Sequence, residues 1–201
     1  MSTIIDGLSL GSIYALIALG YTMVYGIAKM LNFAHGDIIM VGAYAILTTI
    51  MAFGNVPLAI LVSVIVCTVL GILTEKAAYK PLRGASPLAV LITAIGVSYL
   101  LQSIAQIIYG AQSKPVTIAE PKRINILGVE VSRATLITLL VGAVIMIALN
   151  VFINRTKVGR AMLAVSEDRG AAQLMGINVN AIISITFAIG SALAAFASVF
   201  Y

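Results

Sequence analysis

Five long stretches of this chain contain no charged side chain, and they limit the class of fold open to it. A helix needs about 20 apolar residues to cross the hydrocarbon core of a bilayer. Only 9% of the 201 residues are charged, whereas a soluble domain carries roughly 25%. A transmembrane β-barrel would instead show short alternating segments. The sequence therefore predicts an all-α fold, a polytopic transmembrane helical bundle. The uncharged stretches are Gly7–Ala28, Ile38–Thr74, Gly84–Ser113, Ala134–Asn154 and Gly170–Tyr201.

Turn signals divide these stretches into about six spans. Gly54, Asn55 and Pro57 interrupt the longest stretch, and Ser86 followed by Pro87 is typical of a helix start. An alternative, in which Met30–Gly42 is re-entrant, would reverse the direction of every later span. The expected spans are 7–28, 36–53, 57–75, 87–109, 134–153 and 178–201.

The Lys and Arg residues favour an outside N-terminus, because positive residues are retained on the cytoplasmic side. Eight would then lie inside and four outside. The net charge of +5 follows from such loops and indicates no nucleic-acid partner. The inner set is Lys29, Lys76, Lys80, Arg83, Arg155, Lys157, Arg160 and Arg169, and the outer set is Lys114, Lys122, Arg123 and Arg133.

The stretch 110–132 is the only substantial outer loop expected. Within it, apolar and polar residues alternate on both sides of Gly128 over Ile124–Val131. This alternation predicts a small β-hairpin. Ser132 is placed to cap the helix that follows.

No catalytic constellation is evident. The chain has one His and one Cys, no phosphate-binding Gly-rich loop, and no His or Cys pair at metal-ligand spacing. We expect no cofactor and no metal, and we expect that the chain is not itself an enzyme. The spans also lack a central charge, which weighs against an ATP-independent, ion-coupled secondary transporter.

The most polar intrusion near a membrane boundary is Leu31–Asp37. Asn32 and His35 are candidates to line a transport pathway, since irregular backbone inside a membrane requires protein or water beside it. The alternative is a tight cytoplasmic turn, in which Asn32 or Asp37 caps a helix and His35 bonds to backbone. The pattern alone favours the turn.

Three further pathway candidates, Gln102, Gln106 and Tyr109, share one helix face with Ser98. Glutamines are costly in a membrane unless paired, so this face should look into the bundle or a wet cavity. Simple hydrogen bonding between helices explains the pattern equally well.

Small residues predict close helix packing in two places. Gly7 and Gly11 stand four residues apart in the first span, and Gly190, Ala194 and Ser198 stripe the last. Such faces let helix backbones approach closely.

The charged segment Arg155–Ile177 separates the last two uncharged stretches. Ser166 can cap a helix over 167–175, with Glu167 and Asp168 in its first turn and Gly176 ending it. A helix this short does not persist alone in water. Its apolar residues Ala171, Leu174 and Met175 must therefore dock on the chain's own membrane core or on a cytoplasmic partner.

Several motifs closely resemble those of branched-chain amino acid ABC transporter permeases. One runs from Leu31 through Asp37 to Tyr44, and another from Gly159 through Glu167 and Asp168 to Asn178. The start, Gly7–Gly26, and the close, Thr186–Ala195, are similar too. The match keeps order and spacing over nearly the whole chain.

The resemblance implies a single permease transmembrane domain over 1–201 in a prokaryotic plasma membrane (the inner membrane if Gram-negative). It also implies several partners: a second permease subunit, two cytoplasmic ABC ATPases, an extracytoplasmic solute-binding protein and membrane lipid. Leucine, isoleucine and valine are the family's default substrates, and related permeases carry urea and short amides. Because family members continue beyond Tyr201, we expect the chain to be C-terminally incomplete. The alternative function is an ATP-independent transporter or channel for a small neutral solute.

The segment 160–177 is similar to the importer coupling loop, Glu-Ala-Ala, three residues, then Gly. This chain has Gly170 at the acidic position but keeps both alanines, the gap and the glycine. The resemblance implies that closure of the ATPases pushes on this segment and tilts the spans. The implied coupling residues are Arg160, Glu167, Asp168, Ala171, Ala172, Leu174, Met175 and Gly176.

Overall fold

The computed structural model describes residues 2–112, 123–126 and 129–200, and within them six helices are long and apolar enough to cross a membrane. All six lie near the predicted ranges, so the predicted helical bundle is confirmed. The span that starts in α3 continues through a π-helical turn, η1 (Glu75–Tyr79), and a 3-10 turn, η2 (Lys80–Leu82). The six helices are α1 (Ser2–Ala28), α2 (His35–Phe53), α3 (Val56–Thr74), α4 (Pro87–Tyr109), α5 (Arg133–Arg155) and α8 (Val179–Phe200).

Two short helices and a hairpin complete the described elements. Helices α6 (Lys157–Glu167) and α7 (Arg169–Leu174) link α5 to α8. Strands β1 (Arg123–Ile126) and β2 (Val129–Ser132) pair antiparallel, with Ile126 opposite Val129. The predicted hairpin is therefore confirmed. The rest of the predicted outer loop, 113–122 and 127–128, lies outside the described residues.

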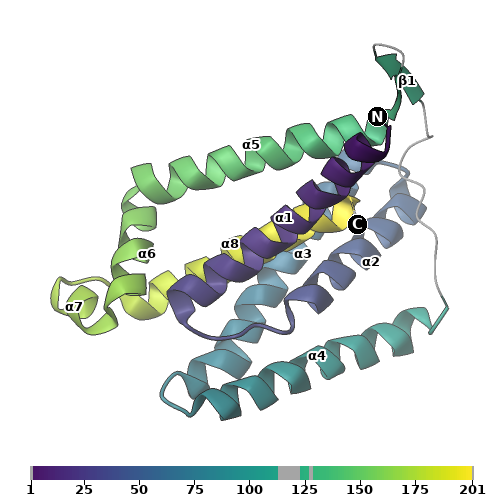
Figure 1. The fold of residues 1–201 in the computed structure, drawn as a ribbon. Helices are drawn as coiled ribbons and strands as arrows, with labels where there is room; N and C mark the ends of the chain where they lie inside the picture. Colours follow the sequence, from purple (N-terminus) through teal and green to yellow (C-terminus); the bar gives the residue numbers. More distant parts are fainter. Residues whose placement is uncertain (1, 113–122, 127–128, 201) are drawn as a thin grey trace.

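Successive spans run in alternating directions (Figure 1). One end of the bundle carries α6 and α7, and the other carries the hairpin, the start of α1 and the end of α8. Residues 35–53 form one continuous helix, α2, that runs back toward the hairpin end. The re-entrant alternative for Met30–Gly42 is therefore wrong.

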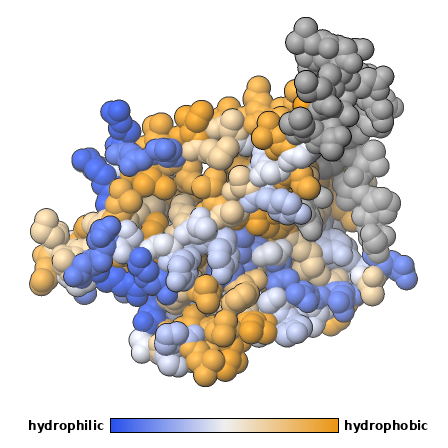
Figure 2. Space-filling model, in the orientation of Figure 1, coloured by the Kyte–Doolittle hydropathy of each residue, from blue (hydrophilic) through white to orange (hydrophobic). Residues whose placement is uncertain are grey.

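The end that carries α6 and α7 holds the eight Lys and Arg residues that the sequence predicts to be inside. Hydrophilic side chains gather at this end (Figure 2). Because positive residues stay on the cytoplasmic side, we assign this end to the cytoplasm.

Local signals fix where the helices begin and end. Gly54 ends α2 in the left-handed conformation, with φ of 64°, which glycine adopts without steric cost. The Asn55 side chain then accepts a hydrogen bond from the Leu58 N–H at 3.1 Å and starts α3. Ser86 does the same for α4 through the Ala89 N–H at 3.4 Å. The turns expected near residues 54 and 86 are confirmed.

Helix α8 is the centre of the bundle, because it packs against α1, α2 and α3. Its small residues make this possible: Ala194 is fully buried, and Gly190 lies against Gly20 of α1. Ser198 faces Gly42 of α2. The predicted close-packing stripe on the last span is confirmed. Helices α4 and α5 are peripheral and expose most of their apolar side chains, toward lipid or other protein.

We predict that Gly71→Ala destabilises the bundle where α3 crosses α8. A Cβ atom at Gly71 would overlap the Ser191 hydroxyl and lie 2.6 Å from the Ser191 Cβ. Overpacking of this kind costs about 1–3 kcal/mol, so the apparent Tm in detergent should fall. The control is Gly96→Ala in α4, where nothing lies within 4 Å. Equal Tm values for the two variants would contradict the packing described.

Candidate functional site

Helix α6 lies across the cytoplasmic ends of α1, α5 and α8 (Figure 1). The Thr156 hydroxyl accepts a hydrogen bond from the Gly159 N–H at 2.9 Å and starts the helix. Met162 and Val165 are buried and share a core cluster with Ile182 of α8. Sequence reasoning missed this helix, although Val158, Met162 and Val165 have the i, i+4, i+7 spacing of an amphipathic helix.

Helix α7 is shorter than predicted and starts at a different residue. The Asp168 carboxylate accepts hydrogen bonds from the N–H groups of Gly170 and Ala171, at 2.7 and 3.0 Å. Ser166 was wrongly predicted as this cap. Its hydroxyl instead donates to the Leu163 carbonyl at 2.7 Å, inside the last turn of α6. Glu167, expected in the first turn of α7, ends α6.

The end of α7 agrees with the prediction at Gly176. Its φ is 80°, and its N–H donates to the Gln173 carbonyl at 3.0 Å. The N–H of Ile177 donates to the Ala172 carbonyl, also at 3.0 Å. These two bonds form a Schellman motif, which satisfies carbonyls at the helix end.

The apolar side chains of α7 point away from this chain. Leu174 is 91% exposed and Met175 is 82% exposed, and Ala171 is exposed too. Only Ala172, at 3% exposure, is buried against α6 and α8. The sequence left two docking sites open for these residues. The prediction that they dock on the chain's own membrane core is wrong for Leu174 and Met175. Arg160, on α6, is also exposed.

Arg169 ties the start of α7 to the end of α1. Its guanidinium donates to the Ala28 carbonyl, and Lys29 leaves α1 in the left-handed conformation, with φ of 51°. Burial, and secondly the positive charge of Arg83, lowers the pKa of Arg169 from its ordinary value. The start of α7 and the end of α1 are therefore joined by a hydrogen bond.

A buried ion pair lies in the extension of α3 at the same end, and both of its members hydrogen-bond to α8. Glu75 is fully buried and forms a salt bridge with Arg83. The Ser184 hydroxyl donates to the other Glu75 oxygen at 2.7 Å, and Arg83 also donates to the Asn180 side chain. Sequence reasoning treated Arg83 only as a loop charge. The available signal was Glu75, placed directly after 37 uncharged residues.

The connection between α1 and α2 is held by side-chain contacts rather than by caps. Asn32 is 2% exposed and accepts a hydrogen bond from the Tyr79 hydroxyl at 3.0 Å. The N-cap residue of α2 is Ala34, with no side-chain cap. The expectation that Asn32 or Asp37 caps a helix is therefore wrong.

His35 packs against Gly20 and lies edge-on to the Tyr21 ring, with centroids 6.3 Å apart. Its ring nitrogens make no hydrogen bond within the described residues, although the Ile17 backbone lies beside the ring. The predicted contact of His35 with backbone is therefore found at Ile17, but not at hydrogen-bond geometry.

The polar face of α4 looks toward α2, as expected of a face turned into the bundle. The Gln102 amide donates to the Asp37 carboxylate at 2.9 Å and to Ser98 at 3.1 Å. The Tyr109 ring stacks on Tyr44, with centroids 4.1 Å apart and planes 12° apart. Gln106 lies on the same helix and is exposed.

These pathway candidates do not gather in one place. Asn32 contacts the α3 extension, His35 contacts α1, and Gln102 contacts α2. Sequence reasoning considered Asp37 only as a helix cap and expected no charge at the centre of a span. Asp37 and Glu75 both lie within candidate spans. Among the described residues, no group of three or more His, Cys, Asp or Glu could hold a metal ion.

Six candidate spans and a cytoplasmic helix that exposes apolar side chains define a multi-pass membrane subunit that works beside other proteins. A family model described as "branched-chain amino acid transport system / permease component" matches residues 3–201. The chain belongs to this family. It is therefore a membrane permease component.

Similar proteins come from bacteria and archaea. The permease protein BraD of Pseudomonas aeruginosa, from a high-affinity branched-chain amino acid transport system, is 40% identical over 99% of this chain and 69% of BraD. LivH of Escherichia coli K12 is 37% identical over 96% of this chain and 68% of its own length. A probable LivH of Methanocaldococcus jannaschii is 31% identical over 84% and 55%. No solved structure matches the chain.

We predict that Glu75→Gln strongly destabilises the cytoplasmic end of the bundle. Arg83, whose side chain is 14% exposed, would lose its counter-charge. Removing one partner of a buried ion pair costs about 3 kcal/mol or more. Thermal unfolding in detergent should show a lower Tm than for Lys80→Gln, which changes an exposed Lys nearby. A Tm equal to that of the Lys80 variant would contradict the assigned pair.

We also predict that Asp168→Ala loosens α7. Loss of an N-cap costs about 1 kcal/mol, so the amides of Gly170 and Ala171 should exchange hydrogen for deuterium several times faster. Gln173→Ala, an exposed change on the same helix, should leave their exchange unchanged. Unchanged exchange in the Asp168 variant would show that the cap does not hold the helix.

Proposed function

We propose that this chain is the permease subunit of an ATP-driven importer that moves branched-chain amino acids across the cytoplasmic membrane. The family match over residues 3–201 and relatives named for this transport support the substrate class. Uptake of urea or a short amide instead of branched-chain amino acids, in a transport assay, would replace this substrate class.

The observation that carries the proposal is the exposure of Leu174 and Met175, at 91% and 82%. Both lie at the cytoplasmic end, at the tip of a six-residue helix that α6 and α8 hold through Ala172. An exposed pair of large apolar residues, away from the lipid-facing spans, marks a protein contact. A cytoplasmic ATPase with an apolar groove is the partner that fits this surface.

The complete importer would comprise this chain, a second permease subunit, two cytoplasmic ABC ATPases and an extracytoplasmic solute-binding protein. ATP hydrolysis would take place on the ATPases. Peripheral helices α4 and α5, which expose apolar faces, would contact lipid and the second permease subunit. The proposed coupling set is Arg160, Glu167, Asp168, Ala171, Ala172, Leu174, Met175 and Gly176.

Closure of the ATPases would move α7 as a rigid piece. The Asp168 cap and the Gly176 end hold its backbone, and the contact from Arg169 to the Ala28 carbonyl passes the movement to α1. Helix α6 passes it to α5 and α8 through their shared core. The spans would then tilt together and open the pathway to alternate sides.

We predict that the double variant Leu174→Asp and Met175→Asp abolishes binding to the ATPases. The two Asp carboxylates would be buried without a partner in an apolar contact with the ATPase. Burial of each unpaired charge costs several kcal/mol of binding free energy. The measurement is co-purification of tagged permease with the ATPases in detergent, together with leucine uptake in proteoliposomes.

The control places the same two charges on the exposed loop before α4, as Gly84→Asp and Ala85→Asp. This control should bind the ATPases as the unchanged chain does. Full ATPase binding and uptake by the Leu174 and Met175 variant would show that α7 is not the coupling segment.

A further inference from the structure

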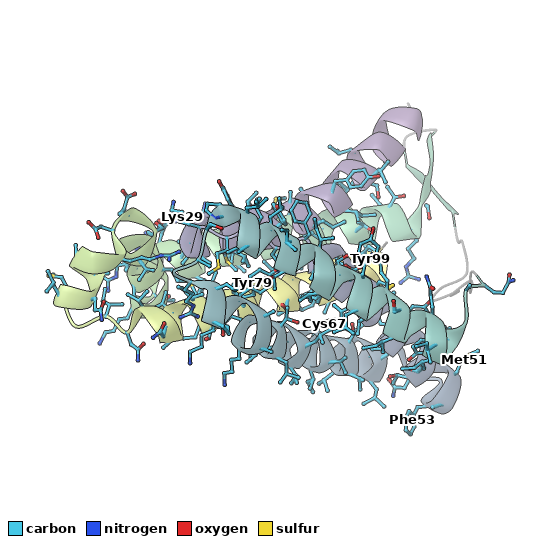
Figure 3. The ribbon with its side chains drawn as sticks, turned by 90° about the horizontal axis from the view of Figure 1, so that it is seen from below. Lys29, Met51, Phe53, Cys67, Tyr79 and Tyr99 are labelled. Atoms are coloured by element: carbon cyan, nitrogen blue, oxygen red, sulfur yellow. The ribbon has the colours of Figure 1, made fainter. Side chains whose placement is uncertain are left out.

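The first turn of α2 lies inside the bundle rather than at its cytoplasmic end. His35 packs on Gly20, which is about 12 Å along α1 from its end at Ala28. The Cys67 thiol donates to the Ile38 carbonyl at 3.4 Å. Cys67 is well separated from Lys29 at one end and from Met51 and Phe53 at the other (Figure 3). The connection 29–34 therefore runs into the membrane before α2 begins.

Asp37 stands at this internal helix start and is 7% exposed. Its partner Gln102 lies about 22 Å along α4 from Pro87 and about 10 Å from Tyr109. The carboxylate is therefore well away from both membrane surfaces. A charged group at such a depth is costly and is found where it pairs with another charge or binds a solute.

The two buried acidic residues of the spans differ in the partners that offset their negative charge. Glu75 has the Arg83 guanidinium and the Ser184 hydroxyl. Asp37 has the neutral Gln102 amide, and in the described part of the chain the only ion pair is that of Glu75. A buried carboxylate without a cation is an incomplete site. Its charge calls for a cation from outside the described residues.

The surroundings of Asp37 suit a small zwitterion. Gln102 also bonds Ser98, and Gln106 continues the polar face one turn outward, where it is exposed. The stacked rings of Tyr44 and Tyr109 lie about 10 Å, or seven residues, farther along both helices. Hydrophilic residues also form a band across the middle of the face in Figure 2. A polar track therefore leads along α4 toward Asp37.

We infer that Asp37, positioned by Gln102, receives the ammonium group of the amino acid as it crosses the permease. This inference rests on the proposed function. An ammonium group offers three N–H donors and one positive charge. It would neutralise the Asp37 carboxylate and supply hydrogen bonds beyond the one from Gln102. Gln102 holds Asp37 toward α4 and acts as a positioning residue.

The test is leucine uptake into proteoliposomes that contain the assembled transporter with its solute-binding protein. Asp37→Asn should lower the uptake rate by about tenfold or more, since a charge-assisted hydrogen bond is replaced by a neutral one. Asp37→Glu, which keeps the charge, should restore part of the rate. The control is Thr48→Val on the same helix, whose hydroxyl bonds its own backbone at 2.9 Å and whose loss should leave uptake unchanged.

Three other results would overturn the inference. Uptake by an assembled Asp37→Asn transporter at the unchanged rate would show that the carboxylate does not meet the solute. Failure of both Asp37→Asn and Asp37→Glu to assemble, while Thr48→Val assembles, would assign Asp37 to packing or to a cation of the second permease. An unchanged transporter that imports urea and no amino acid would contradict the proposed substrate and with it the ammonium site.

Discussion

Inside a bilayer, the hydrogen bonds of a polar group are made only with another part of the protein or with a bound solute. This constraint organises the bundle. Glu75 is neutralised by Arg83 and Ser184, and Tyr79 bonds Asn32. Together these contacts fasten the α3 extension to α8 and to the connection between α1 and α2. Asp37 has only a neutral partner. The same constraint therefore supports the inference that Asp37 binds a transported solute.

The cytoplasmic end combines these polar contacts with helices that lie outside the membrane core. Arg169 places α7 against the end of α1, and buried Met162 and Val165 anchor α6. Leu174 and Met175 remain exposed beyond this anchored base. This anchored base with an exposed apolar tip supports the proposed coupling role of α7.

The features that depend on residues close together in the sequence, such as the spans and the helix ends, are predicted well. The uncharged stretches define the six spans, and Gly54, Ser86 and Gly176 mark ends and starts through their backbone or side-chain chemistry. The sequence predicts Ser166 rather than Asp168 as the cap of α7, because Ser and Asp both suit that role. The contacts of Glu75 with Ser184 and of Asp37 with Gln102 join residues 109 and 65 positions apart. No local pattern reports such pairs, so only the folded arrangement shows them.

The most direct test of the account is cross-linking from the tip of α7 in the assembled transporter. A Leu174→Cys variant, made with Cys67→Ala so that no other thiol reacts, should cross-link to a cysteine in the ATPase groove. Addition of ATP should change the yield. An Ile107→Cys variant, placed on the exposed face of α4, should give no such product. An assembled transporter in which position 174 never cross-links to the ATPase would contradict the account.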